Sequence, residues 1–120
     1  MSRILIVEDN APNRALLLAV LKPEGFEILT AENGLLGVEV AQRERPDLIL
    51  MDVMLPGLSG YEATRRIKAH GATRHIPIIA ITANAGPAER DRALDAGCDG
   101  FIAKPIDTRS LARQMRLFLH

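Results

Sequence analysis

Short, continuously apolar runs recur along this chain, and longer segments with helical periodicity separate them. A strand that is apolar at every position is typical of a parallel sheet with helices covering both faces. Strands that alternate with helices also favour parallel βα units, so we predict an α/β fold with five of them. Glu27 and Thr30 make the second strand more polar, as expected of a strand at the sheet edge. The strands are expected at Arg3–Val7, Glu27–Ala31, Leu48–Asp52, Ile78–Thr82 and Phe101–Ala103.

The segments between the strands carry the signals that begin and end helices. Pro12 suits a first helical position, and Ser59 can cap the helix that follows the turn at Pro56-Gly57. Gly97 is a typical C-terminal stop. The helices are expected at about Pro12–Leu21, at Gly34–Arg45, from Ser59 to about His70, at Pro87–Ala96, and from Asp107 or Thr108 to Leu119.

Length, charge and cysteine content limit the classes of protein that the chain can represent. At 120 residues it is expected to form one domain, spanning residues 1–120. Its 15 basic and 15 acidic residues balance, so bulk charge gives no support to nucleic-acid or membrane-surface binding. The single cysteine, Cys98, cannot form an internal disulfide, which indicates a reducing compartment. No secretion signal follows Met1 and no apolar run approaches the ~20 residues of a membrane span, so we expect a cytoplasmic protein.

Polar side chains stand at the ends of four of the expected strands. They are Glu8 and Asp9 after the first strand, Asp52 at the end of the third, Thr82 at the end of the fourth, and Lys104 after the fifth. The carboxyl ends of parallel strands meet at one edge of a sheet, and open α/β sheets place their sites there. We therefore expect three carboxylates, one hydroxyl and one ammonium group to lie together.

This combination of groups suits the transfer of a phosphoryl group. Crowded carboxylates raise one another's proton affinity, and a hard cation such as Mg²⁺ relieves the repulsion. A metal ion and a lysine can neutralise the charge of the phosphoryl oxygens, and a hydroxyl can donate a hydrogen bond to them. A carboxylate can itself be the nucleophile, which gives an aspartyl phosphate. Asp52 is the best candidate, because Glu8 and Asp9 lie side by side and look like metal holders.

Four stretches carry a resemblance to a known family: ILIVEDN (4–10), DLILMDVMLPGLSGYE (47–62), PIIAITA (77–83) and GCDGFIAKPI (97–106). Across nearly its whole length the chain resembles the CheY-like receiver domains of response regulators in two-component signalling. Its EDNxxNR pattern, from Glu8 to Arg14, is similar to receivers of hybrid histidine kinases and to single-domain receivers of the DivK type. The resemblance implies a flavodoxin-like three-layer sandwich with a parallel sheet in strand order 2-1-3-4-5.

The resemblance also implies roles for the residues around the acidic cluster. Asp52 would be the phosphoacceptor. Asp9 would bind Mg²⁺ directly, Glu8 would act on the metal through a water molecule, and the backbone carbonyl of Met54 would be a further ligand.

Four more residues receive roles by the same resemblance. Lys104 would pair with the phosphoryl group, and the Lys104-Pro105 peptide bond would be cis. Thr82 and Phe101 would form the switch pair, with the hydroxyl drawn toward the phosphoryl oxygens while the ring turns inward.

The expected function is therefore a phosphorylation-dependent switch of a two-component or phosphorelay system, not a stand-alone metabolic enzyme. A sensor histidine kinase or a histidine phosphotransfer protein would donate the phosphoryl group, and slow autodephosphorylation would remove it. An effector protein would bind the changed surface of helix 87–96, strand 101–103 and the last helix, with no direct contact to nucleic acid or membrane. A single-domain protein and a receiver from a larger kinase both fit, and the start at Met1 and the end soon after the last helix favour the first.

Three other classes were weighed against this one. A pseudo-receiver, which binds proteins without phosphorylation, usually lacks one of the acidic, hydroxyl or lysine groups, and all of them are present here. A haloacid-dehalogenase-like phosphatase needs a second aspartate two residues after the nucleophile, but position 54 is Met. A flavodoxin needs a first loop rich in Ser, Thr and Gly, but the loop here is Glu8-Asp9-Asn10, which would repel a phosphate without a metal ion.

Overall fold

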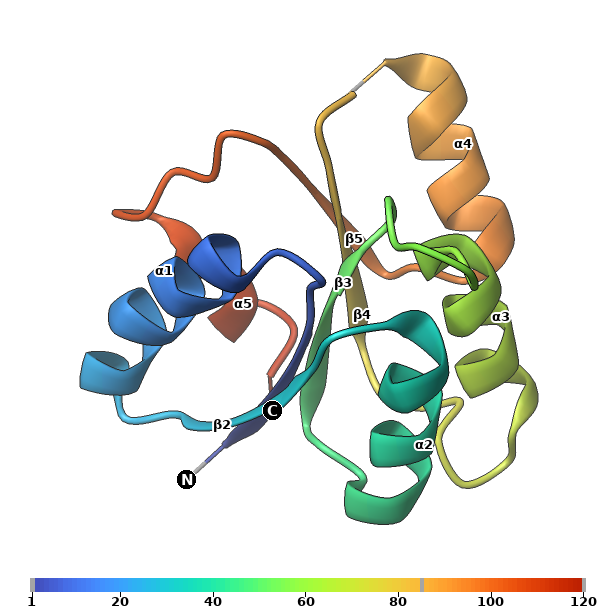
Figure 1. Cartoon of the computed structure of the whole chain (residues 1–120), viewed down its shortest axis with the longest axis horizontal. Coiled ribbons are helices and arrows are strands. Elements are labelled where there is room, and N and C mark those ends of the chain that lie inside the picture. The colour runs from blue at the N-terminus through green and yellow to red at the C-terminus, as the bar shows by residue number, and fades with distance from the viewer. Residues whose placement is uncertain (1, 85, 120) are drawn as a thin grey trace.

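A computed structural model describes residues 2–84 and 86–119 (Figure 1). Five parallel strands form one sheet in the order β2-β1-β3-β4-β5, as the family resemblance implies. The predicted strands are confirmed, except that the last begins one residue earlier. Their bounds are Arg3–Val7 (β1), Glu27–Ala31 (β2), Leu48–Asp52 (β3), Ile78–Thr82 (β4) and Gly100–Ala103 (β5).

Helices follow each strand, and their ends carry the predicted caps. The Ser59 hydroxyl accepts a hydrogen bond from the Glu62 N–H at 3.2 Å, and Gly97 ends a helix with φ of 103°. Arg45 adopts a left-handed conformation, so the second helix ends one residue before its predicted end. Among the described residues, no helix combines the length and the apolar character that a bilayer crossing requires. The helices are Ala11–Leu21 (α1), Gly34–Glu44 (α2), Gly60–Ala69 (α3), Pro87–Ala96 (α4) and Leu111–Arg116 (α5), with a short 3₁₀ turn at Lys22–Glu24 (η1).

The last helix is shorter than the sequence predicts. Asp107 does not begin the helix, because its carboxylate accepts the Arg109 N–H at 3.0 Å and closes a turn. Its backbone carbonyl accepts the Ser110 N–H at 3.2 Å, which completes that turn before the helix begins. At the other end, Leu117 and Phe118 donate to carbonyls three residues back, so the final turn is tighter than an α-helix. The predicted start at residue 107 or 108 and the predicted end at Leu119 are therefore wrong.

The sheet separates two apolar cores. Alternate residues of each inner strand face opposite sides, so Leu5 packs with the core under α2, α3 and α4, whereas Ile4 packs with the core under α1 and α5. Figure 1 shows α1 and α5 on one side of the sheet and the other three helices on the opposite side. Both β3 and β4 are buried at every position, which explains why their sequences are continuously apolar. The more polar β2 lies at the edge, as predicted.

Candidate functional site

Three carboxylates meet at the carboxyl ends of β1 and β3. The register pairs Val7 with Met51, so the residues that follow these two positions come side by side. Glu8, Asp9 and Asp52 each offer a carboxylate oxygen, and these oxygens lie within 4.8 Å of one another. Glu8 and Asp52 are each only 2% exposed, whereas Asp9 is exposed to solvent. Hard oxygen donors at this spacing fit a small divalent cation such as Mg²⁺.

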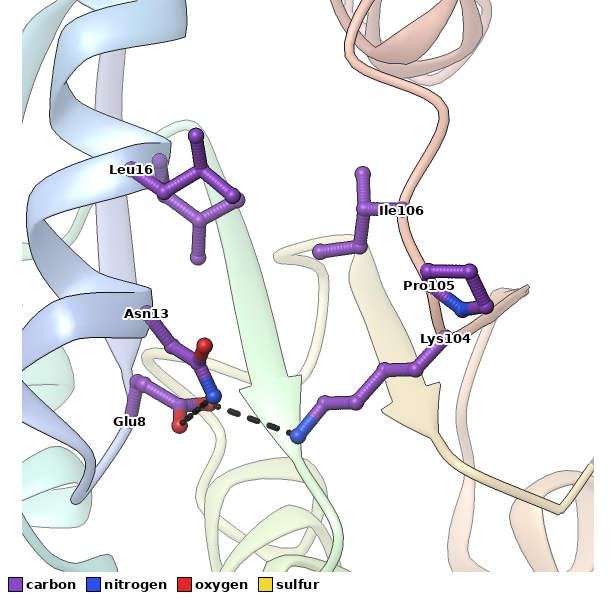
Figure 2. A pocket seen from close by; sticks show the side chains of 7 residues that line it. Glu8, Asn13, Leu16, Lys104, Pro105 and Ile106 are labelled. Carbon is purple, nitrogen blue, oxygen red and sulfur yellow. Dashed lines mark hydrogen bonds and ion pairs between the residues drawn. The ribbon is translucent and has the colours of Figure 1, made fainter.

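Lys104 supplies the positive charge of this cluster. Its Nζ lies 3.2 Å from Asp52 Oδ2 and 3.9 Å from Glu8 Oε2, and Figure 2 shows the side chain extending across the site toward Glu8. Its backbone N–H donates to the Thr82 carbonyl at 2.7 Å, which fixes the residue beside the end of β4. The Lys104-Pro105 peptide bond is cis, as the family resemblance implies. One ammonium group thus lies near two of the three clustered carboxylates, and the site favours additional positive charge.

Backbone contacts orient Asp52 at the rim of the sheet. Its Oδ1 accepts the Met54 N–H at 3.0 Å, while Oδ2 faces Lys104. The Met54 side chain is 75% exposed. Met54 therefore contacts Asp52 through its main chain and not through its side chain. The two oxygens of Asp52 therefore have different surroundings, one on the loop after β3 and one on the lysine.

Glu8 is held by residues that the sequence did not identify as part of the site. The Asn13 side-chain amide donates to Glu8 Oε1 at 3.2 Å, and the Asn10 N–H approaches the same oxygen at 3.4 Å. The Arg14 guanidinium donates to the backbone carbonyl of Glu8 at 2.8 Å. All three residues belong to the EDNxxNR pattern, so the pattern was the available signal, although it could not reveal these contacts.

A cavity with apolar lining residues borders the acidic cluster. A cavity of about 400 Å³ lies beside Glu8 and Lys104, between α1 and the segment that follows β5. Figure 2 shows Leu16 on one side of it and Pro105 and Ile106 on the other. The charged groups Glu8 and Lys104 therefore share one cavity with the apolar side chains of Leu16 and Ile106.

Burial and charge shift the proton affinity of Glu8. Removal from water, followed by a hydrogen bond with the neighbouring Asp52 carboxylate and repulsion from its charge, raises the pKa of Glu8 from 4.5 to about 7. The Asn13 amide and the Lys104 ammonium act in the opposite sense, but they do not cancel these effects. Near neutral pH the metal-free site therefore holds Glu8 partly protonated.

We expect the metal-free protein to lose stability as pH rises through 7. The folded chain binds the Glu8 proton more tightly than the unfolded chain, so this contribution is complete below about pH 4.5 and is lost toward pH 7. The loss is on the order of 2 kcal/mol. The measurement is the free energy of urea unfolding in EDTA at pH 5 and pH 8, for the native chain and for Glu8→Gln. The variant lacks the titrating group, so identical pH dependence in the two proteins would contradict the assignment.

Thr82 and Phe101 occupy neighbouring strands, and the side chain of Thr82 forms its hydrogen bonds with the loop after β4 and not with the acidic cluster. The Thr82 hydroxyl accepts the Asn84 N–H at 3.1 Å and donates to the Asn84 carbonyl at 3.3 Å, so it is engaged by the loop after β4. The Phe101 ring is half-buried against the core under α2, α3 and α4. The Arg90 guanidinium of α4 lies 5.5 Å from the centre of that ring.

Comparison with known sequences reveals a family match across most of the chain. The family model of the response regulator receiver domain matches residues 4–116. The polar-differentiation response regulator DivK of Brucella anthropi is 39% identical over 116 residues, which cover 97% of this chain and 94% of that protein. The response regulator PleD of Caulobacter vibrioides is 42% identical over 115 residues, which cover 96% of this chain but only 25% of PleD.

Solved structures match in the same way. The receiver domain of a Pseudomonas aeruginosa sensor histidine kinase aligns with a TM-score of 0.91 and 41% identity, covering 98% of this chain and 96% of that one. That crystal structure contains a magnesium ion coordinated in its active site cleft. The chemotaxis protein CheY4 of Vibrio cholerae aligns with a TM-score of 0.94 and 26% identity, covering 99% of both chains.

Proposed function

Because this chain belongs to the response regulator receiver domain family of two-component signalling, we propose that it is a phosphorylation-dependent switch whose phosphoacceptor is Asp52. The observation that carries the proposal is the surroundings of the Asp52 carboxylate, which is buried beside Lys104 and two further acids. The proposed receiver domain spans residues 1–120. The proposed location is the cytoplasm, which suits the free thiol of Cys98.

The proposed reaction is transfer from a phosphohistidine of a sensor histidine kinase or a histidine phosphotransfer protein. A carboxylate oxygen of Asp52 attacks the phosphorus, and a new O–P bond forms as the P–N bond breaks. The electron pair of the broken bond stays on the imidazole nitrogen. Lys104 is near enough to Asp52 Oδ2 to offset the negative charge of the arriving phosphoryl oxygens.

The same site would remove the phosphoryl group in the proposed cycle. Water attacks the phosphorus, the O–P bond to Asp52 breaks, and inorganic phosphate leaves while Asp52 regains its carboxylate. This self-catalysed step returns the protein to its starting state, so the chain acts as a switch and not as an enzyme with an external substrate.

The proposed cofactor is Mg²⁺, held by Asp9, Asp52 and the backbone carbonyl of Met54, with Glu8 acting through a water molecule. The three clustered carboxylates and the magnesium ion in the related Pseudomonas aeruginosa receiver support this assignment. When bound, Mg²⁺ supplies positive charge against the carboxylates and the phosphoryl oxygens. Asn13 and Lys104 keep Glu8 oriented at the edge of this site.

The proposed switch pair is Thr82 and Phe101. On phosphorylation the Thr82 hydroxyl leaves Asn84 and turns toward the phosphoryl oxygens, and the Phe101 ring moves into the vacated space. The ring has no hydroxyl, so packing alone stabilises its inward position. The movement separates Phe101 from Arg90 and so changes the surface of α4, β5 and α5, where an effector protein binds in this proposal. The phosphoryl group shifts this equilibrium only by its differential stabilisation of the two states.

Amide chemical shifts from nuclear magnetic resonance test the switch directly. We expect acetyl phosphate and Mg²⁺ to shift amides near Asp52 and, beyond them, those of α4, β5 and α5. Thr82→Ala should keep the changes near Asp52 but lose most of the distant ones, and Asp52→Asn should show neither. Phosphorylation without distant changes would refute the switch. Absence of phosphorylation would favour the alternative, a pseudo-receiver that binds proteins without it.

A further inference from the structure

A polar cluster outside the phosphorylation site joins α3 to α4. The hydroxyl of Tyr61, the second residue of α3, donates a hydrogen bond to Glu89 in the first turn of α4. The Arg92 guanidinium lies 4.5 Å from the centre of the Tyr61 ring and 3.6 Å from a carboxylate oxygen of Glu89. Tyr61 is only 4% exposed, whereas the side chain of Glu89 is 21% exposed, so the hydrogen bond is partly buried. A hydrogen bond to a charged group is stronger than one between neutral groups.

The hydrogen bond from Tyr61 to Glu89 persists at physiological pH. Burial and the adjacent Glu89 carboxylate raise the pKa of Tyr61 to about 12. The hydroxyl therefore stays protonated and remains a donor to Glu89.

Apart from these polar contacts, α4 buries little apolar surface against the rest of the domain. Its buried side chains are two alanines, Ala93 and Ala96, and its first residue is preceded by Gly86, which offers no side-chain cap. Two alanines bury little apolar surface and therefore contribute little to holding the helix on the sheet. The hydrogen bond to Glu89 and the contact of Arg92 with the Tyr61 ring therefore add polar contacts to this small apolar one between α4 and α3.

Tyr61 is also fixed relative to the proposed phosphoacceptor. Gly60, its neighbour in α3, packs so closely on β3 that a Cβ there would lie 2.1 Å from the backbone oxygen of Asp52. The Gly60 N–H donates to the Val53 carbonyl at 3.1 Å. The start of α3 therefore cannot move independently of Asp52. A cavity of about 350 Å³ runs from Asp9 and Met54 to Tyr61, Glu89 and Arg92, so the cluster borders the site directly.

We propose that the Tyr61–Glu89 hydrogen bond is a latch that holds α4 in its unphosphorylated position. α4 contacts Tyr61 through Glu89 and Arg92, and it contacts the proposed switch ring Phe101 through Arg90. A phosphoryl group that favours a shifted α4 must therefore act against this bond. Weakening the latch raises the population of the shifted state and tightens binding at Asp52 by the same factor. The latch rests on geometry alone, whereas its link to Asp52 rests on the proposed function.

One variant removes the latch, a second weakens it, and a third provides a matched control. Tyr61→Phe removes the hydroxyl and leaves Glu89 with Arg92, while Glu89→Gln removes the charge. Glu62→Gln makes the same chemical change next to Tyr61, but on an exposed carboxylate that lies 3.4 Å from Arg65. The double variant Tyr61→Phe/Glu89→Gln should add little to Tyr61→Phe alone, because Glu89→Gln acts on the latch through the hydroxyl that Tyr61→Phe has already removed.

Hydrogen exchange in the unphosphorylated protein tests the latch itself. We expect the amides of α4 to exchange roughly tenfold faster in Tyr61→Phe, faster by a smaller factor in Glu89→Gln, and at the native rate in Glu62→Gln. Amides of β1 and β3 should keep their protection in all variants, which shows that the fold is intact. Unchanged exchange of α4 in both latch variants would overturn the proposal.

Binding of beryllium fluoride, an analogue of the phosphoryl group, tests the link to Asp52. In the presence of Mg²⁺ we expect Tyr61→Phe to bind it about three- to tenfold more tightly than the native chain does. Faster exchange of α4 with unchanged affinity would overturn the coupling of the latch to the site. Failure of the native chain and every variant to bind the analogue would count against the proposed function, and the exchange rates would still decide the latch.

Discussion

Replacement of Lys104 by Met lowers the rate of Asp52 phosphorylation by roughly 10²- to 10³-fold in this account. Its Nζ lies 3.2 Å from Asp52 Oδ2, where negative charge accumulates as the phosphoryl oxygens arrive. Methionine keeps the length of the side chain but supplies no charge, so the site loses a group that stabilises the transition state more than the ground state.

The measurement is the initial rate of phosphorylation by acetyl phosphate with saturating Mg²⁺, followed by intact mass. Lys22→Met is the matched control, because Lys22 is exposed and lies in η1, away from the cluster. Both variants should be checked for cooperative unfolding, since removal of Lys104 leaves Glu8 and Asp52 without their nearby cation. A rate for Lys104→Met within a few-fold of the control rate would show that the ammonium has no role in the transfer.

We also expect a large loss of stability when Gly60 is replaced by alanine. A Cβ at this position would lie 2.1 Å from the Asp52 carbonyl oxygen and 2.6 Å from the Val53 Cα, and neither backbone atom can rotate away. Gly60→Ala must therefore displace α3 from β3, at a cost of at least about 3 kcal/mol in the free energy of unfolding. The displacement also moves the Asp52 main chain, so phosphorylation should slow in whatever fraction remains folded.

Gly71 offers a control for the substitution at Gly60. A Cβ at Gly71 meets nothing within 4 Å, so Gly71→Ala should change the free energy of urea unfolding by no more than about 0.5 kcal/mol. Equal stability of the two alanine variants would refute the close packing of α3 on β3.

The sequence predicted the strands well because burial on both faces leaves a strong signal. The central strands β3 and β4 are buried at every position, and only continuous apolar runs satisfy that environment. The strand order, in contrast, followed from the family resemblance, since the pattern of apolar runs does not specify which strands are neighbours. The start of the last helix was missed because an aspartate such as Asp107 can either cap a helix or close a turn with its own backbone.

The acidic cluster was expected from the strand ends, but its supporting contacts were not. Glu8 and Asp52 come together because the β1–β3 register places their strand ends side by side. The hydrogen bond from Asn13 to Glu8 depends on how α1 sits over the sheet, and the bond from Tyr61 to Glu89 depends on how two helices meet. Such helix placements result from packing of the whole domain, and no local pattern in the sequence encodes them.

The most direct test of the account is the mass of the protein after incubation with acetyl phosphate, with and without Mg²⁺. We expect a gain of one phosphoryl group that requires Mg²⁺ and is absent in Asp52→Asn. Asp91→Asn, which removes an exposed carboxylate of α4, should gain the group as the native chain does. No gain in the native chain with acetyl phosphate or a second small-molecule phosphodonor, or an undiminished gain in Asp52→Asn, would contradict the assignment of Asp52 as the phosphoacceptor.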